Sequence, residues 1–164
     1  MKILKWILGL LFGLVAVIGV LVFATRFADG PVALFPGGPF QSGEVRDPPE
    51  DWGFAMAVQE IEFESGGRSR TAWIAVVDGS AFIPASTVFP PGKRWHKDAL
   101  TDPAAVVRID GVRYPVVLTR IAPESPRFAL VLATLAKKYP ALPGGEGVDP
   151  AEAVWLFELR QRSS

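Results

Sequence analysis

The chain contains no cysteine, and this absence excludes several kinds of chemistry. Disulfide bonds, thiolate metal sites, cysteine nucleophiles and lipid attachment at cysteine all need a side chain that the protein lacks. Histidine is nearly absent as well, because His96 is the only one. An imidazole cluster for zinc therefore cannot form, and we expect no protein-bound metal.

The chain also has no excess of charge of either sign, with 17 Lys and Arg residues against 17 Asp and Glu residues. Three of the cations, Lys2, Lys5 and Arg26, flank an N-terminal apolar segment, so the rest of the chain carries 14 cations, all 17 anions and a net charge of −3. Binding to a phosphate backbone requires a strongly basic surface. Nucleic acid is accordingly not an expected partner.

One long apolar run is present, the nineteen uncharged residues from Trp6 to Ala24. A helix of this length covers about 28 Å, close to the hydrocarbon thickness of a bilayer, which is about 30 Å. The alternative is a cleaved secretory signal, whose apolar core normally has only about 7–15 residues. We expect an uncleaved single transmembrane helix that contacts the lipid bilayer through residues 6–24.

Residues in and around this segment predict its orientation and one contact. Lys2 and Lys5 precede the helix and only Arg26 closely follows it, so the positive-inside rule predicts a cytoplasmic N-terminus and an extracytoplasmic domain. Gly9 and Gly13 share one face at a spacing that lets two helices approach closely, which would make a homodimer. The alternative is that glycine is simply common in membrane helices.

The pattern of turn residues divides the chain into three parts. Residues 1–26 form the cytoplasmic N-terminus and the helix, residues 27–52 form a Pro/Gly-rich collar or linker, and residues 53–164 are long enough for one domain. The density of Pro and Gly in the collar breaks both helix and strand periodicity. We expect its apolar side chains to lie over the domain, namely Val32, Leu34, Phe35, Phe40 and Val45.

Residues 53–164 predict a mainly β (α+β) domain of about six strands. Glu60–Glu64 alternates charged and apolar residues, which indicates a strand with its glutamates on a solvated face. Thr71–Val77 is β-branched and aromatic, and Asp78-Gly79 joins it to Ala81–Pro84 as a two-residue hairpin, with Pro84 at a strand end or sheet edge. The other predicted strands are Val106–Asp110, Arg113–Ile121, which follows a turn at Gly111, and Val154–Leu159.

Two helices are predicted between the strands. Ser125 is a typical N-cap residue, Pro126 suits the first helical position, and Pro140 ends the pattern. The helix between them should cover an end of the sheet with an apolar stripe. A second, shorter helix is predicted over Lys93–Leu100, with Trp95 and Ala99 on one side. The stripe of the first helix consists of Phe128, Val131, Leu132, Leu135 and Tyr139.

The densest polar cluster is Lys93-Arg94-Trp95-His96-Lys97, at the start of the shorter helix. Backbone N–H groups at a helix start bind anions, arginine offers a two-pronged donor and lysine a point charge, so this cluster suits a phosphate group. The alternative is a solvated helix face, with Arg94 paired to Asp98 and Trp95 in the core.

The order of these elements resembles the flavin- and deazaflavin-binding split-barrel superfamily, which includes pyridoxamine-phosphate-oxidase-like proteins and deazaflavin-dependent nitroreductases. The resemblance covers about residues 55–160 and rests on Lys93-Arg94-Trp95, Val106–Gly111 and Tyr114-Pro115-Val116. The preceding segment, Asp29–Glu44, resembles the leader of membrane-anchored members of that group. The resemblance implies a split β-barrel with one or two helices, placed behind a single transmembrane helix.

The resemblance also implies a cofactor, FMN or a deazaflavin, and hence a flavin- or deazaflavin-dependent oxidoreductase. No catalytic residue is assigned. The alternative is a non-catalytic envelope protein that binds a ligand or partner with a degenerate barrel and holds no cofactor. The implied cofactor-binding residues are Lys93, Arg94 and Lys97 for the phosphate, Trp95 beside the ring or in the core, and Ser86 and Thr87 as hydrogen-bond donors.

Overall fold

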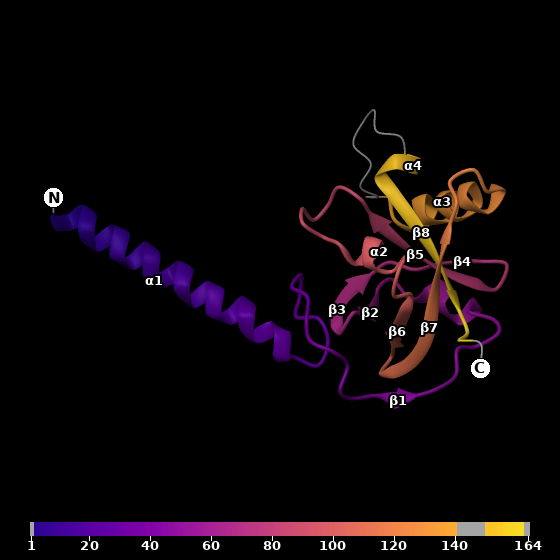
Figure 1. The fold of residues 1–164 in the computed structure, drawn as a ribbon, viewed down its shortest axis with the longest axis horizontal. Coiled ribbons are helices and arrows are strands. Elements are labelled where there is room, and N and C mark those ends of the chain that lie inside the picture. Colours follow the sequence, from indigo (N-terminus) through magenta and orange to yellow (C-terminus); the bar gives the residue numbers. More distant parts are fainter. Residues whose placement is uncertain (1, 141–149, 163–164) are drawn as a thin grey trace.

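The computed structural model describes residues 2–140 and 150–162, and it shows a long N-terminal helix that extends away from a β domain (Figure 1). The helix α1 spans Lys2–Ala24 and continues into a 3₁₀ turn, η1, at Thr25–Phe27. The window Lys5–Phe27 is long and apolar enough to cross a membrane, and none of it is buried against the domain. An exposed apolar helix at this end of the chain is consistent with a signal sequence or a membrane anchor.

The domain is built on one sheet, which confirms the mainly β class. Its hydrogen-bonded strand order is β3-β2-β6-β7-β8-β5-β4, with antiparallel neighbours throughout, and β1 pairs in parallel with β7 beside this path. The strands are β1 (Glu44–Val45), β2 (Ile61–Ser65), β3 (Arg68–Ala72), β4 (Ala75–Val77), β5 (Ser80–Ser86), β6 (Ala104–Ile109), β7 (Val112–Ile121) and β8 (Val154–Arg160).

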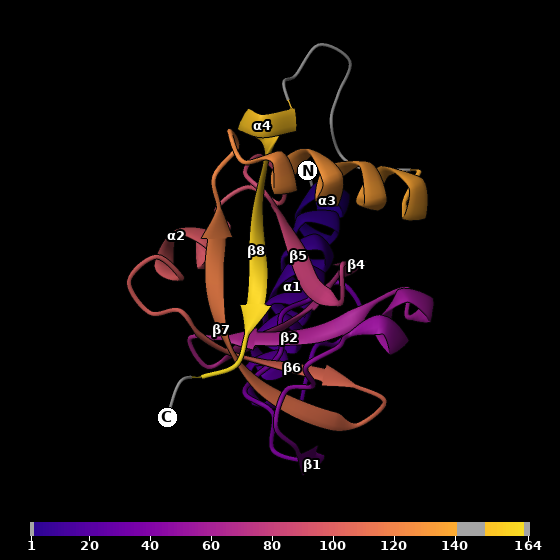
Figure 2. The same ribbon diagram turned by 90° about the vertical axis from the view of Figure 1, so that its right-hand side faces the viewer.

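The strand expected over Thr71–Val77 is in fact two strands, and this break shapes the sheet. β3 and β4 stand at opposite ends of the strand order, yet only Trp73 and Ile74 separate them along the chain. Because consecutive Cα atoms are about 3.8 Å apart, Ala72 and Ala75 lie within about 11 Å of each other. The sheet therefore curls until its two ends meet, and Figure 2 shows β2 and β6 crossing β5 and β8 steeply.

Both predicted hairpin turns are confirmed. Asp78-Gly79 and Asp110-Gly111 each have positive φ at both residues, 50° and 74° in the first and 49° and 78° in the second. Such two-residue turns match the twist of the flanking strands. Pro84 lies inside β5 opposite Leu156, so the prediction of a strand end is wrong. The prediction of a sheet edge is confirmed, because β4 pairs with β5 only from Ser80 to Phe82 and does not reach Pro84.

The longer predicted helix is confirmed as α3 (Pro126–Lys138). The Ser125 hydroxyl accepts the N–H of Arg127 at 3.3 Å, and Phe128, Val131, Leu135 and Tyr139 of the predicted stripe are buried. The shorter helix, α2, covers only Trp95–Asp98, so the expectation of Lys93–Leu100 is too long at both ends. Arg94 has φ −125°, outside the helical range, and beyond the helix the N–H groups of Leu100 and Thr101 make i→i+3 hydrogen bonds. A further four-residue helix, α4 (Pro150–Ala153), precedes β8.

The end of α3 closes the gap between the two ends of the sheet. The Tyr139 hydroxyl accepts the Ile74 N–H at 3.1 Å and donates to the Gln59 carbonyl at 2.6 Å, while Lys138 Nζ donates to the Ile74 carbonyl at 3.0 Å. The Tyr139 ring also stacks on Trp73, with centroids 4.6 Å apart. These contacts hold the chain where it crosses from β3 to β4, as expected for a helix that covers an end of the sheet.

The collar lies against the sheet mainly through polar contacts. Of the five apolar side chains expected to cover the domain only Phe40 is buried, and the other four are exposed. The glutamates of β2 are also not a solvated face, because Glu62 binds the buried Arg108 and Glu64 accepts the N–H of Phe40 at 2.7 Å. Gly37 pairs with Ser69 of β3. The collar therefore covers the outer face of β2 and β3. The division of the chain into parts at residues 26 and 52 stays a prediction.

Candidate functional site

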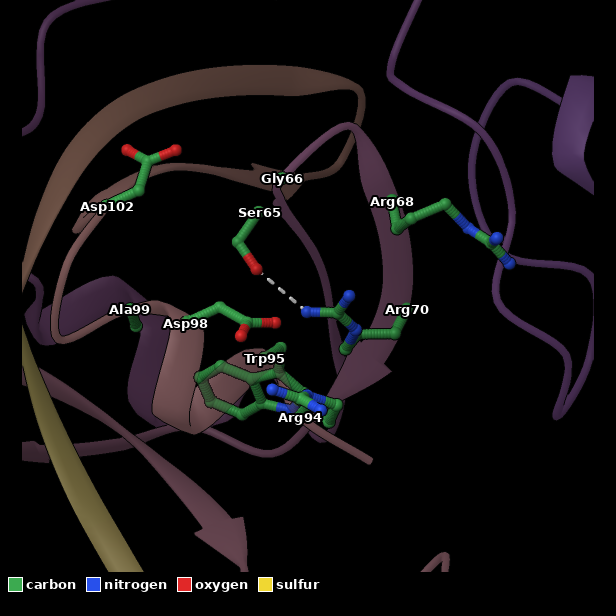
Figure 3. Close-up of a pocket in the computed structure, with 9 residues that line it drawn as sticks. All are labelled: Ser65, Gly66, Arg68, Arg70, Arg94, Trp95, Asp98, Ala99 and Asp102. Carbon is green, nitrogen blue, oxygen red and sulfur yellow. Dashed lines mark hydrogen bonds between the residues drawn. The ribbon is translucent and has the colours of Figure 1, made fainter. Parts of the chain in front are cut away.

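A small cavity lies between the β2–β3 hairpin and α2 (Figure 3). Its volume is about 210 Å³. Six of the nine residues that line it are polar or charged, among them three arginines and two aspartates, and Trp95 forms the aromatic part. The nine lining residues are Ser65, Gly66, Arg68, Arg70, Arg94, Trp95, Asp98, Ala99 and Asp102.

Arg70 faces the cavity because of the register of its hairpin. The Gly66-Gly67 turn pairs Phe63 with Arg70, and directly paired residues of an antiparallel ladder project from the same face. Phe63 is fully buried, so this is the inner face of the curled sheet. The Arg70 guanidinium carbon lies 5.4 Å from the Phe63 ring centre and 5.5 Å from that of Trp95, and Nη1 donates to Ser65 Oγ at 2.9 Å.

The charge of Arg70 lacks a close carboxylate partner. Burial, reinforced by Arg68, lowers the pKa of Arg70 to about 10, and Asp98 opposes this shift. The side chain is still protonated at neutral pH. Among the described residues no Asp or Glu oxygen lies within 4 Å of its guanidinium. A mostly buried cation with unused donors in an open cavity is suited to bind an anion.

Three of the residues singled out from the sequence lie at or near this cavity. Arg94 and Trp95 line it, and Trp95 is at the same time part of the core, as the alternative interpretation expected. Lys93 is half-buried and its Nζ donates to the Phe89 carbonyl at 3.0 Å. Burial and then the charge of Arg70 lower the pKa of Lys93 to about 8. Lys93 and Arg70 therefore contribute to one region of positive charge.

The structure does not bring the other three into the cavity. Lys97 is exposed on α2 and does not line the wall. The Ser86 hydroxyl accepts the N–H groups of Val88 and Phe89, at 3.3 and 3.0 Å, and the Thr87 hydroxyl donates to the Glu152 carbonyl at 2.8 Å. These hydroxyls stabilise the loop after β5, and their role as ligand donors stays a prediction.

The acidic side chains of the wall limit what the cavity accepts. Figure 3 shows the Asp98 carboxylate turned toward Arg70, whereas Arg68 turns away from the other side chains. Arg68 instead donates to the Gly37 carbonyl at 3.1 Å. The pair that the sequence suggested between Arg94 and Asp98 is not within 4 Å in the described part of the chain. Arg94 is thus available to a ligand together with Arg70.

His96 is a core residue rather than part of the cavity wall. It is 1% exposed, its ring meets Trp155 edge-on at 5.0 Å, and its Nδ1 has no hydrogen-bond partner among residues 2–140 and 150–162. Burial, then the charges of Lys93 and Lys97, lower the pKa of His96, so the imidazole is neutral at pH 7. The described residues contain no group of three His, Asp or Glu side chains that would hold a metal ion.

The size of the cavity decides which part of a flavin-type cofactor it fits. Sites that enclose a whole small molecule usually measure about 300–1,000 Å³, and this cavity is smaller, at about 210 Å³. A phosphate group fits it and finds arginine donors there. A flavin or deazaflavin ring does not fit inside, so a cofactor held here would keep its ring outside the cavity.

Sequence reasoning missed Arg70, although a signal for it was present. Arg68-Ser69-Arg70 follows the Gly66-Gly67 turn, and the pairing imposed by that turn already sets Arg70 opposite Phe63. An arginine at a position that strand alternation assigns to the interior is unusual, because charged side chains are rarely buried without a partner. Reading the register of the hairpin along with its periodicity would have drawn attention to this residue.

Comparisons with known proteins found similar solved structures. No protein-family model and no curated protein sequence matches the chain. The crystal structure of the heme storage protein HutZ from Vibrio cholerae is similar over 68% of this chain and 87% of its own, with 14% identity and a TM-score of 0.47. A "putative pyridoxamine 5′-phosphate oxidase" from Listeria innocua is similar over 67% of this chain and 90% of its own, with 10% identity and a TM-score of 0.45.

Proposed function

We propose that this protein is a single-pass, membrane-anchored binding protein whose extracytoplasmic domain holds the phosphate group of a ligand in the cavity around Arg70. The observation that carries the proposal is the Arg70 guanidinium, a mostly buried cation that faces the cavity and has the Ser65 hydroxyl as its side-chain acceptor. Hydrogen bonds between an arginine and a phosphate are about twice as strong as neutral ones. A phosphate would therefore supply the anion that this charge lacks.

The surrounding residues have distinct roles in this proposal. Arg94 donates to the phosphate from the opposite wall, and Lys93 adds positive potential without lining the cavity. Trp95, which is 8% exposed, adds a small apolar part to the wall beside the phosphate position. A phosphorylated flavin or deazaflavin is the finer candidate, with its ring at the cavity mouth beside Trp95. When bound, such a cofactor supplies electron transfer to a small organic substrate.

The test is a titration of the full-length protein, purified in detergent, with FMN, with riboflavin and with inorganic phosphate. FMN is expected to bind, inorganic phosphate to compete with it, and riboflavin to bind about tenfold or more weakly, because riboflavin lacks the charged group. Arg70→Gln and Arg94→Ala should each weaken FMN binding by about 10- to 100-fold, since each removes a charge-assisted hydrogen bond.

The control is Lys97→Ala. Lys97 and Arg94 are both exposed and lie close together in the chain, but only Arg94 lines the cavity. Equal losses in Arg94→Ala and Lys97→Ala would mean that general surface charge binds the ligand, and the proposed cavity would be wrong. Because Arg70 packs on Phe63 and Trp95, the exposed Arg94 provides the variant that tests binding with the least effect on folding.

If inorganic phosphate competes but FMN binds no more tightly than inorganic phosphate does, the phosphate site stands and the flavin is excluded as the ligand. If no anion binds, the second function is favoured, a non-catalytic envelope protein that holds a protein partner near the membrane. The two aspartates on the cavity wall, Asp98 and Asp102, support that alternative. Crosslinking in membranes would then recover a protein partner, or a homodimer through Gly9 and Gly13. The same product would form with the wild-type protein and with the Arg70→Gln/Arg94→Ala double variant.

A further inference from the structure

A tight turn at Val32–Phe35 presents apolar side chains to the outside, immediately after the N-terminal helix. Val32 and Phe35 exchange both backbone hydrogen bonds, at 3.1 and 3.0 Å, so the turn has a fixed shape. At its tip Ala33 has a left-handed φ of 53° and Leu34 is 97% exposed. Val32 and Phe35 are 44% and 47% exposed. We call residues 31–36 the juxtamembrane turn.

The base of the juxtamembrane turn is tied to the end of α1. The Thr25 hydroxyl, one residue beyond the helix, lies 2.8 Å from the Val22 carbonyl of α1 and 3.0 Å from the Pro36 carbonyl, so its one proton is shared between the helix end and the turn. Gly38 N–H donates to the Ala28 carbonyl at 3.0 Å. Figure 1 shows the chain folding back beside the end of α1 before it runs on to β1. The tip of the turn therefore lies next to the point where the apolar helix ends.

The turn is also tied to the domain. Gly37 N–H donates to the Ser69 carbonyl of β3 at 2.9 Å. Asp29, on the other side of the turn, forms an ion pair with the buried Arg108 of β6 at 2.9 Å. The juxtamembrane turn is thus held between the helix and the sheet and does not hang from a free linker.

We propose that the juxtamembrane turn inserts Leu34 and Phe35 into the interfacial layer of the bilayer leaflet from which α1 emerges. The proposal rests on the proposed function in one respect, that α1 spans a membrane. Residues 30–43 carry no charge, and the Arg68 guanidinium, which donates to the Pro36 and Gly37 carbonyls, lies at the base of the turn and not at its tip, so the tip itself brings no ionic group into the interface. Phe27 is 71% exposed beside it, and exposed apolar residues of this kind contact the boundary of headgroups and acyl chains.

A second attachment point has a structural consequence for the domain. With α1 alone the domain could tilt about the end of the helix, whereas a helix and an inserted turn together fix the tilt of the domain relative to the membrane surface. The β2–β3 hairpin, which carries Arg70, is joined to this segment through Ser69 and Gly37. The insertion therefore keeps the cavity at a fixed distance and angle from the membrane surface.

The absence of cysteine makes a direct test straightforward, because a single introduced cysteine is the only labelling site. Leu34→Cys, Leu14→Cys and Leu130→Cys are each labelled with the environment-sensitive fluorophore NBD in the full-length protein. Each protein is reconstituted into phosphatidylcholine vesicles, with or without lipids that carry a nitroxide quencher on the acyl chain. Leu14 lies in the middle of α1, and Leu130 is a 55% exposed position on α3, which Figure 1 shows on the far side of the domain.

The proposal expects the label at Leu34 to be quenched by the nitroxide lipids at least about twofold more than the label at Leu130, and to be shielded from iodide in the water. If Leu14 is quenched and Leu34 behaves like Leu130, the insertion is wrong while the anchor stands. If Leu14 is not quenched, the anchor itself is wrong and the insertion falls with it. Shielding of Leu34 from iodide without quenching by the lipids would place the turn against protein, for example a second copy, and would also overturn the proposal.

Discussion

Arg108 of β6 and Asp29, five residues beyond α1, form an ion pair of 2.9 Å although 79 residues separate them in the chain. Arg108 is 8% exposed and binds Glu62 of β2 as well, and its guanidinium carbon lies 4.2 Å from the Phe40 ring centre. The Ser42 hydroxyl, the Gln41 N–H and Arg108 together hold the pKa of Asp29 well below its usual range. This cluster joins the chain that follows α1 to the sheet.

We predict that Arg108→Met destabilises the full-length protein by about 3 kcal/mol, near the lower end of what removing one partner from a buried ion pair costs. The lower end applies because the carboxylate partners are partly exposed and regain water. Thermal denaturation in detergent measures the loss. The matched control is Arg46→Met, because the Arg46–Glu44 pair is exposed and such pairs contribute about 0–1 kcal/mol. Equal stability of the two variants would contradict the role assigned to Arg108.

A second prediction concerns the closure of the sheet. Tyr139→Phe keeps the ring stacked on Trp73 but leaves the N–H of the buried Ile74 without its acceptor, which costs about 1–3 kcal/mol. The loss should appear in thermal denaturation and as faster hydrogen exchange of the Ile74 amide. Tyr114→Phe is the control, since no hydrogen bond of the Tyr114 hydroxyl occurs in the described part of the chain. A stable Tyr139→Phe variant with unchanged exchange would show that the hydroxyl does not hold the crossing.

Local patterns predicted the elements whose formation depends on local chemistry. The hairpin turns at Asp78-Gly79 and Asp110-Gly111 need residues that tolerate positive φ, and these residues are visible in the sequence. The break at Trp73 was not predictable in this way, because Thr71–Val77 reads as one continuous strand. At this break Ile74 is bonded to Tyr139 and Lys138, which are distant in the sequence and lie close only in the curled sheet.

Part of the candidate site could likewise be predicted from local sequence patterns, and part could not. Arg94 and Trp95 stand in a visible cluster of charged residues, and both line the cavity. Arg70 comes from a strand more than twenty residues earlier, and it faces inward only because of its pairing with Phe63. Four of the five apolar collar residues stayed exposed because backbone and ionic contacts, which periodicity does not reveal, fix the path of the collar.

His96 leads to a prediction about pH. Its pKa is lowered by burial, then by Lys93 and Lys97, with a smaller contribution from Arg120 and an opposing one from Asp98. His96 takes up a proton near pH 6.5 in the unfolded chain but not in the folded chain, so its contribution to stability is constant above that pH and falls as the pH decreases below it. His96→Gln should remove this part of the pH dependence. Because His96 is the only histidine, its Cε1 proton resonance gives the titration directly, and a midpoint at or above 6.5 would contradict the prediction.

The last prediction concerns the reactivity of Lys93. With a pKa of about 8, caused by burial and by the charge of Arg70, about half of its amine is neutral at pH 8, where an ordinary lysine is almost entirely protonated. A limiting amount of acetic anhydride should therefore acetylate Lys93 ahead of the exposed Lys97, as measured by mass spectrometry over a pH series. Arg70→Gln removes one of the two causes, so it should shift the acetylation midpoint of Lys93 to higher pH, with acetylation of the exposed Lys97 followed as the reference in the same sample.

Inorganic phosphate gives the complementary result in the same assay. An anion held by Arg70 and Arg94 stabilises the ammonium form of Lys93, so phosphate should raise the midpoint and slow acetylation at pH 8. In Arg94→Ala, where phosphate binds weakly, the midpoint should no longer respond to phosphate. If phosphate slows the acetylation of Lys93 and of Lys97 equally, the effect is one of ionic strength and the cavity is not the anion site. If the acetylation midpoint of Lys93 is that of an ordinary lysine, the positive region assigned to Lys93 and Arg70 does not exist.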